Sequence, residues 1–189
     1  TTGGGKGNGT VFKIDPTTGA LTTLVEFSGS IGNAPGASPR GGVVLDTAGN
    51  LYGTTSSSGP GLSEYGTGFK IDAATGELTT LHAFGLGDQG RQPYAAVTLD
   101  SDGDIYGTTY GGWSASGTVF KIDGDSGAIS YPALFNRANG ATPQGAVTLD
   151  ALGNIYGTTT WGGEFNGGTV FKIDAVTGLL TTLVSFDRA

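Results

Sequence analysis

The chain has 189 residues, 37 of them Gly and none Cys, and its formal net charge is −7. Without Cys it has no disulfide framework, thiolate metal site or Cys nucleophile. Its Lys and Arg residues are scattered along an acidic chain, which argues against a nucleic-acid surface, and no apolar run is long enough to insert into a membrane.

One short segment occurs four times and defines a repeat of about fifty residues. The pattern Gly-Thr-x-Phe-Lys-Ile-Asp occupies residues 9–15, 66–72, 117–123 and 168–174. A second pattern, Tyr-Gly-Thr-Thr after Leu or Ile, occupies residues 51–55, 105–109 and 155–159, and residues 1–4 look like the end of another copy. The repeat units are residues 1–40, 41–92, 93–143 and 144–189, within a single domain or a segment of a longer array.

Each unit predicts four strands, named A to D in chain order. Strand A covers residues 42–45, 96–99 and 146–149, and strand B is the Tyr-Gly-Thr-Thr segment. A Gly-rich loop leads to strand C, the Phe-Lys-Ile segment, where alternate residues face opposite sides. Strand D covers residues 21–27, 78–84, 129–135 and 179–186. Turns that begin with Asp and end near Gly join A to B and C to D, as is typical of hairpins.

This pattern predicts an all-β chain, a β-propeller of four-stranded antiparallel blades. No window has the 3.6-residue period of a helix. A parallel β-solenoid is the alternative, but it would have shorter coils and no hairpin turns.

The repeated segments resemble a known family. Gly-Thr-Val-Phe-Lys-Ile-Asp, Thr-Gly-x-Leu-Thr-Thr-Leu, the Phe–Gly–Pro loop and Gly-Asn-Ile-Tyr-Gly-Thr-Thr are similar to the GloVer-type tandem propeller repeat of bacterial surface and secreted proteins, over nearly the whole chain. The blade pattern is also similar to PQQ-type propellers, although Phe27, Phe84, Phe135 and Phe186 stand where that repeat usually ends in Trp. The resemblance implies a propeller in an extracellular or cell-surface setting, and no particular activity.

The first blade is incomplete, because strand A and nearly all of strand B are missing from the first unit. Three interpretations stay open. The chain is a segment of a longer array, or a neighbouring molecule fills the blade and builds an oligomer or filament, or a four-bladed ring tolerates one two-stranded blade.

The variable B–C and D–A loops are expected on one face, where the ligand sites of a rigid scaffold usually lie. These loops carry a set of aromatic residues suited to stacking on sugar rings: Trp113, Trp161, Tyr110, Tyr65, Tyr94 and Phe165. The alternative is that these rings pack between blades or cover the core.

Asp100, Asp102 and Asp104 resemble part of a calcium loop, because alternate carboxylates can converge on one hard cation. The corresponding turns of the other units lack two of these carboxylates, so a plain hairpin turn is the alternative. No other cofactor is indicated.

Catalysis has little support in the sequence. His82 is the only histidine, and no Gly-x-Ser-x-Gly segment is present. The Lys and Asp of strand C recur in every unit, which favours a structural role, and we expect these lysines to contact carboxylates between blades. Three loop carboxylates, Glu64, Asp88 and Glu164, leave a hydrolase or lyase as one alternative.

The sequence therefore predicts a non-enzymatic extracellular repeat protein with a structural or adhesive role, which self-associates through the incomplete blade. A carbohydrate-binding propeller with glycan ligands is the second hypothesis, and a hydrolase or lyase is the third.

Overall fold

The computed structural model describes residues 7–61, 65–85, 90–112 and 116–188. Within these ranges the chain is all-β and contains no helix. No segment there is a helix long and apolar enough to cross a membrane.

The strands form four antiparallel sheets, which are the blades. Blade 1 contains β1 (Thr10–Ile14) and β2 (Leu21–Glu26). Blade 2 contains β3 (Val44–Leu45), β4 (Leu51–Thr55), β5 (Thr67–Ile71) and β6 (Leu78–Ala83). Blade 3 contains β7 (Thr98–Leu99), β8 (Ile105–Thr109), β9 (Thr118–Ile122) and β10 (Ile129–Leu134). Blade 4 contains β11 (Thr148–Leu149), β12 (Ile155–Thr159), β13 (Thr169–Ile173) and β14 (Leu180–Ser185).

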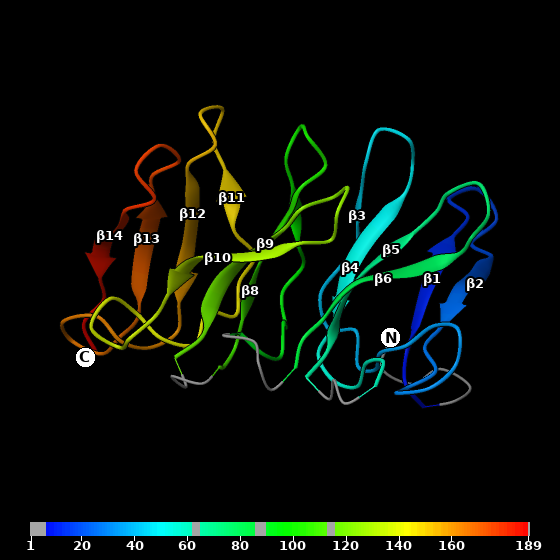
Figure 1. Ribbon diagram of the computed structural model, residues 1–189, viewed down its shortest axis with the longest axis horizontal. Coiled ribbons are helices and arrows are strands. Elements are labelled where there is room, and N and C mark those ends of the chain that lie inside the picture. The colour runs from blue at the N-terminus through cyan, green and yellow to red at the C-terminus, as the bar shows by residue number, and fades with distance from the viewer. Residues whose placement is uncertain (1–6, 62–64, 86–89, 113–115, 189) are drawn as a thin grey trace.

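Each complete blade is an A-B-C-D meander, and blade 1 has only its C and D strands among the described residues. The predicted four-stranded blades and the incomplete first blade are therefore confirmed, and the parallel solenoid is excluded. The blades stand side by side in a row, with blades 1 and 4 at opposite ends (Figure 1). Because this row is open, the structure is not the closed four-bladed ring of the third interpretation.

Strand A is shorter than predicted, with two paired residues in place of four. The backbone just before it contacts the preceding blade instead of its own ladder. The hydroxyl of Thr54 donates to the Ala95 carbonyl at 3.2 Å, and that of Thr108 donates to the Gly145 carbonyl at 3.0 Å. These hydrogen bonds join strand B of blades 2 and 3 to the next blade along the row.

The hydrophobic core is divided into three clusters, each between two consecutive blades. At the centre of each cluster, the Phe that follows strand D packs edge to face against the strand C Phe of the next blade. The ring centroids are 5.3, 5.3 and 5.1 Å apart in the pairs Phe27–Phe69, Phe84–Phe120 and Phe135–Phe171. The described residues therefore form a core at every junction of the row, and each blade depends on its neighbours for burial.

Candidate functional site

The two ends of the row leave apolar residues exposed that are buried at the internal junctions. On blade 1, Ile14 is 53% exposed, whereas its equivalents Ile71, Ile122 and Ile173 are at most 2% exposed. On blade 4, Phe186 is 46% exposed, whereas the corresponding residues after β2, β6 and β10 are at most 1% exposed. The two end faces carry opposite halves of the same junction, since blade 1 presents the strand C side and blade 4 presents the strand D side.

A groove of about 570 Å³ lies between blades 1 and 2. Phe12, Lys13 and Leu24 line it on blade 1, and the blade 2 side carries Val43, Leu45, Leu51 and Ile71. Val43 is 38% exposed, whereas its equivalents Val97 and Val147 are 2% exposed. A smaller groove of about 200 Å³ continues along β1 from Phe12 to Thr10. The groove is the part of this junction that an A–B hairpin of blade 1 would cover.

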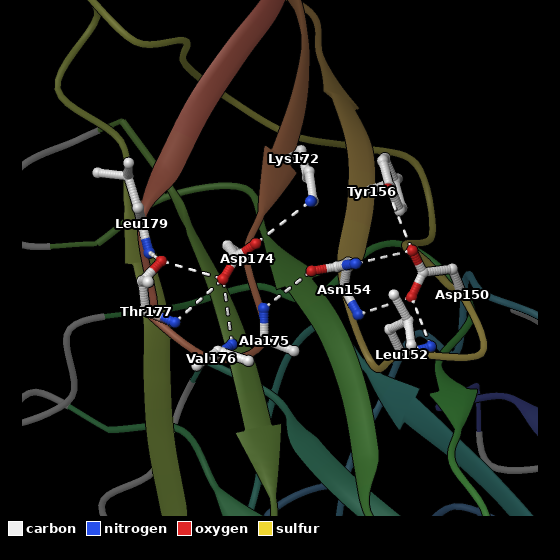
Figure 2. Close-up of polar contacts among 10 residues, drawn as sticks. All are labelled: Asp150, Leu152, Asn154, Tyr156, Lys172, Asp174, Ala175, Val176, Thr177 and Leu179. Atoms are coloured by element: carbon white, nitrogen blue, oxygen red, sulfur yellow. Dashed lines mark hydrogen bonds and ion pairs between the residues drawn. The ribbon is translucent and has the colours of Figure 1, made fainter.

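On the face of the hairpin turns, the Asp carboxylates accept hydrogen bonds from nearby backbone amides and side chains. Asp150 accepts hydrogen bonds from the amides of Leu152 and Asn154 with one oxygen, and from the Asn154 amide group and the Tyr156 hydroxyl with the other (Figure 2). The Asn154 side chain in turn accepts the Ala175 amide at 3.0 Å. This network ties the A–B turn to the C–D turn of the same blade.

The C–D turns use a second carboxylate in the same way. Asp174 accepts the amides of Val176 and Thr177 and the Thr177 hydroxyl (Figure 2). Hydrogen bonds from the Thr177 amide and then its hydroxyl, followed by one from Lys172, lower the pKa of Asp174 to about 2. The equivalent carboxylates Asp15, Asp72 and Asp123 also have lowered pKa values, because turn amides and hydroxyls donate to them.

The proposed calcium loop has no set of converging ligands. Asp100 accepts the amides of Asp102 and Asp104 and the Tyr106 hydroxyl. Asp104 is directed at the Lys121 ammonium and the Gly124 amide. Among the residues that the structure describes, no three His, Cys, Asp or Glu side chains are grouped to hold a metal ion. The carboxylates of Asp100 and Asp104 therefore stabilise the turns of blade 3.

The expectation of Lys–carboxylate contacts between blades is wrong for Lys121 and Lys172. Lys121 pairs with Asp104 in the A–B turn of blade 3, and Lys172 lies 3.3 Å from Asp174, which directly follows its strand. Both contacts are within one blade. The hydrogen bond to Asp104 raises the pKa of Lys121. The lysine side chain points along its own sheet because it also lies over the strand B tyrosine ring, as with Lys121 at 5.4 Å from the Tyr106 centroid.

The variable loops do share one face, because they pair with each other. Each D–A loop pairs with the B–C loop of the blade that it leads into. The isolated antiparallel bridges are Ala37 to Ser57, Arg91 to Gly111 and Ala141 to Trp161. The loop face is therefore a second candidate site, at the opposite ends of the strands from the hairpin turns.

This face also has a backbone feature that the sequence does not predict. The residue before the loop Pro has a left-handed backbone in all three D–A loops: Ser38 at φ 57°, Gln92 at 57° and Thr142 at 49°. Its amide donates to the preceding blade, and its carbonyl accepts from its own blade, as in Thr142 N to Ser116 O at 2.7 Å and Thr160 N to Thr142 O at 3.4 Å. Such a conformation is strained for non-Gly residues. The repeated x-Pro pairs were the available signal, but Pro by itself favours extended backbone before it.

The described members of the predicted aromatic set have different surroundings. Tyr94 and Tyr110 are neighbours, with ring centroids 5.2 Å apart, and Tyr110 is 39% exposed. Tyr65 packs against the core between blades 2 and 3, and Trp161 lies under the Arg188 guanidinium at 3.5 Å. Phe165 is half exposed on the loop between β12 and β13. Trp113 lies outside the described residues.

Of the three candidate catalytic carboxylates, the structure describes one. Glu64 and Asp88 lie outside the described residues, and Glu164 is exposed on a loop of blade 4. His82 lies on β6 opposite Gly68, with its ring 4.9 Å from the Phe84 ring. It is therefore a strand residue beside the core, as the apolar residues at its equivalent positions predicted.

The open row of antiparallel blades with cores between them defines a propeller-type repeat protein. The chain belongs to the Gloeobacter/Verrucomicrobia repeat family, whose model matches residues 1–189. No curated protein matches the chain in sequence.

Solved structures of low sequence identity share the fold. TolB from Acinetobacter baumannii has a TM-score of 0.61 and 17% identity over 96% of this chain and 40% of its own. The extracellular domain of BT4673 from B. thetaiotaomicron has a TM-score of 0.59 and 10% identity over 94% of this chain and 20% of its own. A candidate 6-phosphogluconolactonase from Bacteroides uniformis has a TM-score of 0.54 and 18% identity over 94% of this chain and 50% of its own. The chain thus spans half or less of each of these structures.

Proposed function

We propose that the chain is a non-enzymatic structural repeat module of an extracellular or cell-surface protein, and that it joins end to end with further copies of its repeat. The observation that carries the proposal is the complementary exposure of the two end faces. Blade 4 presents Val184 and Phe186, the equivalents of the residues that bury the strand C side of the next blade. Blade 1 presents that strand C side in Phe12 and Ile14.

A face of this kind supports self-association because the internal junctions already display the packed form. Val25 and Phe27 of blade 1 lie in one cluster with Phe69 and Ile71 of blade 2. A contact between blade 4 of one copy and blade 1 of the next repeats this arrangement. Head-to-tail contacts of this type produce rings when the rotation closes and filaments when it does not.

The association is tested with variants that disable one face each. Phe186→Asp removes the blade 4 face, and Ile14→Asp removes the blade 1 face. Light scattering of the parent chain over a concentration series is expected to show rising mass, and each variant alone is expected to stay a monomer. An equimolar mixture of the two variants should give dimers only, because each retains one complementary face.

Val176→Asp is the matched control, since Val176 is 93% exposed in a hairpin turn. This variant should associate like the parent. A parent chain that stays monomeric at all concentrations, or a Phe186→Asp variant that still grows, would refute the end-to-end proposal.

A carbohydrate-binding loop face is the second candidate function. Its support is the Tyr94–Tyr110 pair, with Arg40 at 4.8 Å from the Tyr94 ring centroid, which offers an aromatic surface beside a cation. Calorimetric titration with neutral and anionic oligosaccharides tests it. Saturable binding that Tyr110→Ala abolishes and Phe165→Ala retains would support this site.

A hydrolase is the third alternative, and the lactonase name belongs to a structure that shares only the fold. Incubation of the chain with 6-phosphogluconolactone, against a heat-inactivated sample, tests it directly. Turnover above the spontaneous rate that Glu164→Gln abolishes would contradict the non-enzymatic proposal.

A further inference from the structure

The groove between blades 1 and 2 has the shape of a missing part of the repeat. At the junction of blades 2 and 3, the A–B hairpin of blade 2 contributes Val44 and Tyr52 to a cluster with Val97, Leu99 and Ile105. At the junction of blades 3 and 4, Tyr106 packs with Val147, Leu149 and Ile155 in the same way. At the first junction, the equivalent residues Val43, Leu45 and Leu51 line the groove instead.

We propose that this groove binds a β-hairpin of the same repeat. The hairpin would supply the A and B strands of blade 1, next to β1 as strand C and β2 as strand D. The hairpin adds its strand B to the edge of β1 and covers the apolar side of blade 2. Addition of a strand to a sheet edge gives affinity through the main chain and specificity through the alternate side chains. The inference rests on the proposed function, because both make the visible blades part of a larger set of repeats.

The internal blades fix the register of the incoming strand. Strand B Tyr pairs with strand C Lys, and strand B Gly pairs with strand C Phe, as in Tyr52 with Lys70 and Gly53 with Phe69. The incoming Tyr is therefore expected opposite Lys13, and the incoming Gly opposite Phe12.

Each of these two pairs has a physical reason. The Lys70 ammonium lies 5.6 Å from the centroid of the Tyr52 ring, so Lys13 is placed to cover an incoming Tyr in the same way. A Cβ added at Gly53 would lie 2.7 Å from Cζ of Phe69, and one at Gly157 would lie 2.6 Å from Cζ of Phe171. Any residue other than Gly at this position would therefore have to displace the Phe ring.

Blade 1 differs from the others at one contact, and this difference makes the proposal specific. In blades 2 and 4, the hairpin Asn accepts an amide from the residue after the strand C Asp, as with Asn50 and Ala73. The equivalent residue of blade 1 is Pro16, which has no amide hydrogen. The incoming hairpin Asn therefore keeps its hydrogen bond inside the hairpin but gains none from blade 1, unlike Asn50 and Asn154 within the chain.

The test uses a fluorescent peptide with the sequence of residues 146–157, added to the intact chain. Anisotropy is expected to rise to saturation, and amide hydrogen exchange is expected to slow in β1. A peptide with Gly157→Val or Tyr156→Ala should bind at least tenfold more weakly, which corresponds to about 1.4 kcal/mol. A peptide with Asn154→Ala should lose much less than tenfold, because it loses only the hydrogen bond to Asp150 inside the hairpin.

A fused hairpin removes the dependence on peptide affinity. When the same twelve-residue sequence is joined by a short linker ahead of Thr1, its effective concentration reaches about the millimolar range. The fused chain is expected to melt at a higher temperature than the fused Gly157→Val form. Equal melting temperatures for the two fusions, or exchange that slows at β14 and not at β1, would overturn the proposal.

Variants of the groove wall locate the site without affecting the core. Leu45→Asp should weaken peptide binding, because Leu45 is 65% exposed in the groove. Leu152→Asp, on an exposed turn of blade 4, should not weaken it. Light scattering in the same samples separates the two proposals, since peptide binding to a monomeric chain supports the hairpin site even if end-to-end association fails.

Discussion

The internal junctions and the two ends of the row contain the same residue types in different surroundings. Phe120 is fully buried between blades 2 and 3, whereas its equivalent Phe12 on blade 1 is 37% exposed. The C–D hairpins around both residues have the same register and the same turn hydrogen bonds. The apolar positions of this repeat therefore serve the contact between blades. Each blade forms its strand hydrogen bonds within itself, but its apolar side chains are buried only against a neighbouring blade.

The largest effect on stability is expected from replacing the strand C Phe by Ala, at an internal junction and at the end of the row. Phe120→Ala should lower the free energy of unfolding by about 3–5 kcal/mol, because it leaves a cavity in a packed core. Phe12→Ala should cost less than about 1 kcal/mol, since its ring already contacts solvent. Urea denaturation of the two variants measures both values. Equal losses would contradict the division of the core into junctions.

A smaller effect is expected when the backbone of strand B gains a side chain. Gly157→Ala should lower the free energy of unfolding by about 1–3 kcal/mol, because the new methyl group overlaps the Phe171 ring. Gly42→Ala is the control, because an added Cβ there would lie 4.0 Å from its nearest neighbour, the Ala96 Cβ. Urea denaturation should separate them, and a Gly157→Ala variant as stable as Gly42→Ala would show that the ring moves away freely.

The turn network should contribute less than core packing. Asn154→Ala removes two hydrogen bonds and should cost about 1–2 kcal/mol. Pro16→Ala restores a backbone amide at residue 16 of blade 1. It should change the free energy of unfolding by about 1 kcal/mol or less, because no hairpin Asn of the described residues is placed to accept from that amide as Asn50 and Asn154 do in blades 2 and 4. Thermal denaturation of both variants tests this difference between a complete and an incomplete blade.

The smallest effect is expected from acid. The folded pKa of Asp174 is lowered to about 2 from an ordinary value of 3.8, so its stabilisation is present above about pH 4 and is lost as the pH falls toward 2. The lowered pKa values of Asp15, Asp72 and Asp123 act in the same direction. Melting temperatures measured from pH 5 to pH 2 should fall steadily, and Asp174→Asn should flatten part of that fall. An unchanged profile would show that the turns open before their carboxylates titrate.

Much of this fold could be predicted from the sequence, because each strand and turn pattern occurs in several repeat units. The strand B and strand C segments, the Asp–Gly turns and the missing hairpin of blade 1 were all visible as patterns. The strained residues Ser38, Gln92 and Thr142 were not, since nothing local favours a left-handed backbone before Pro. Their conformation is set by hydrogen bonds to two blades at once.

The candidate sites were less predictable for a related reason. The sequence pattern places Trp161 and Tyr65 in loops. In the structure, Arg188 lies over the Trp161 ring, and Tyr65 packs against the core between blades 2 and 3. Such partners come from distant parts of the chain, so spacing alone does not indicate them. The partner of Lys121 is unpredictable for the same reason, because Asp104 reaches it from the neighbouring A–B turn of blade 3.

The location of the core between blades also affects how the molecule comes apart. In an array of nearest-neighbour units, each end blade is held by one junction and each internal blade by two, so unfolding is expected to start at the ends and progress inward. An open row therefore always has two weak points, however many repeats are added to it. A closed ring has none, because closure adds a junction without adding a repeat.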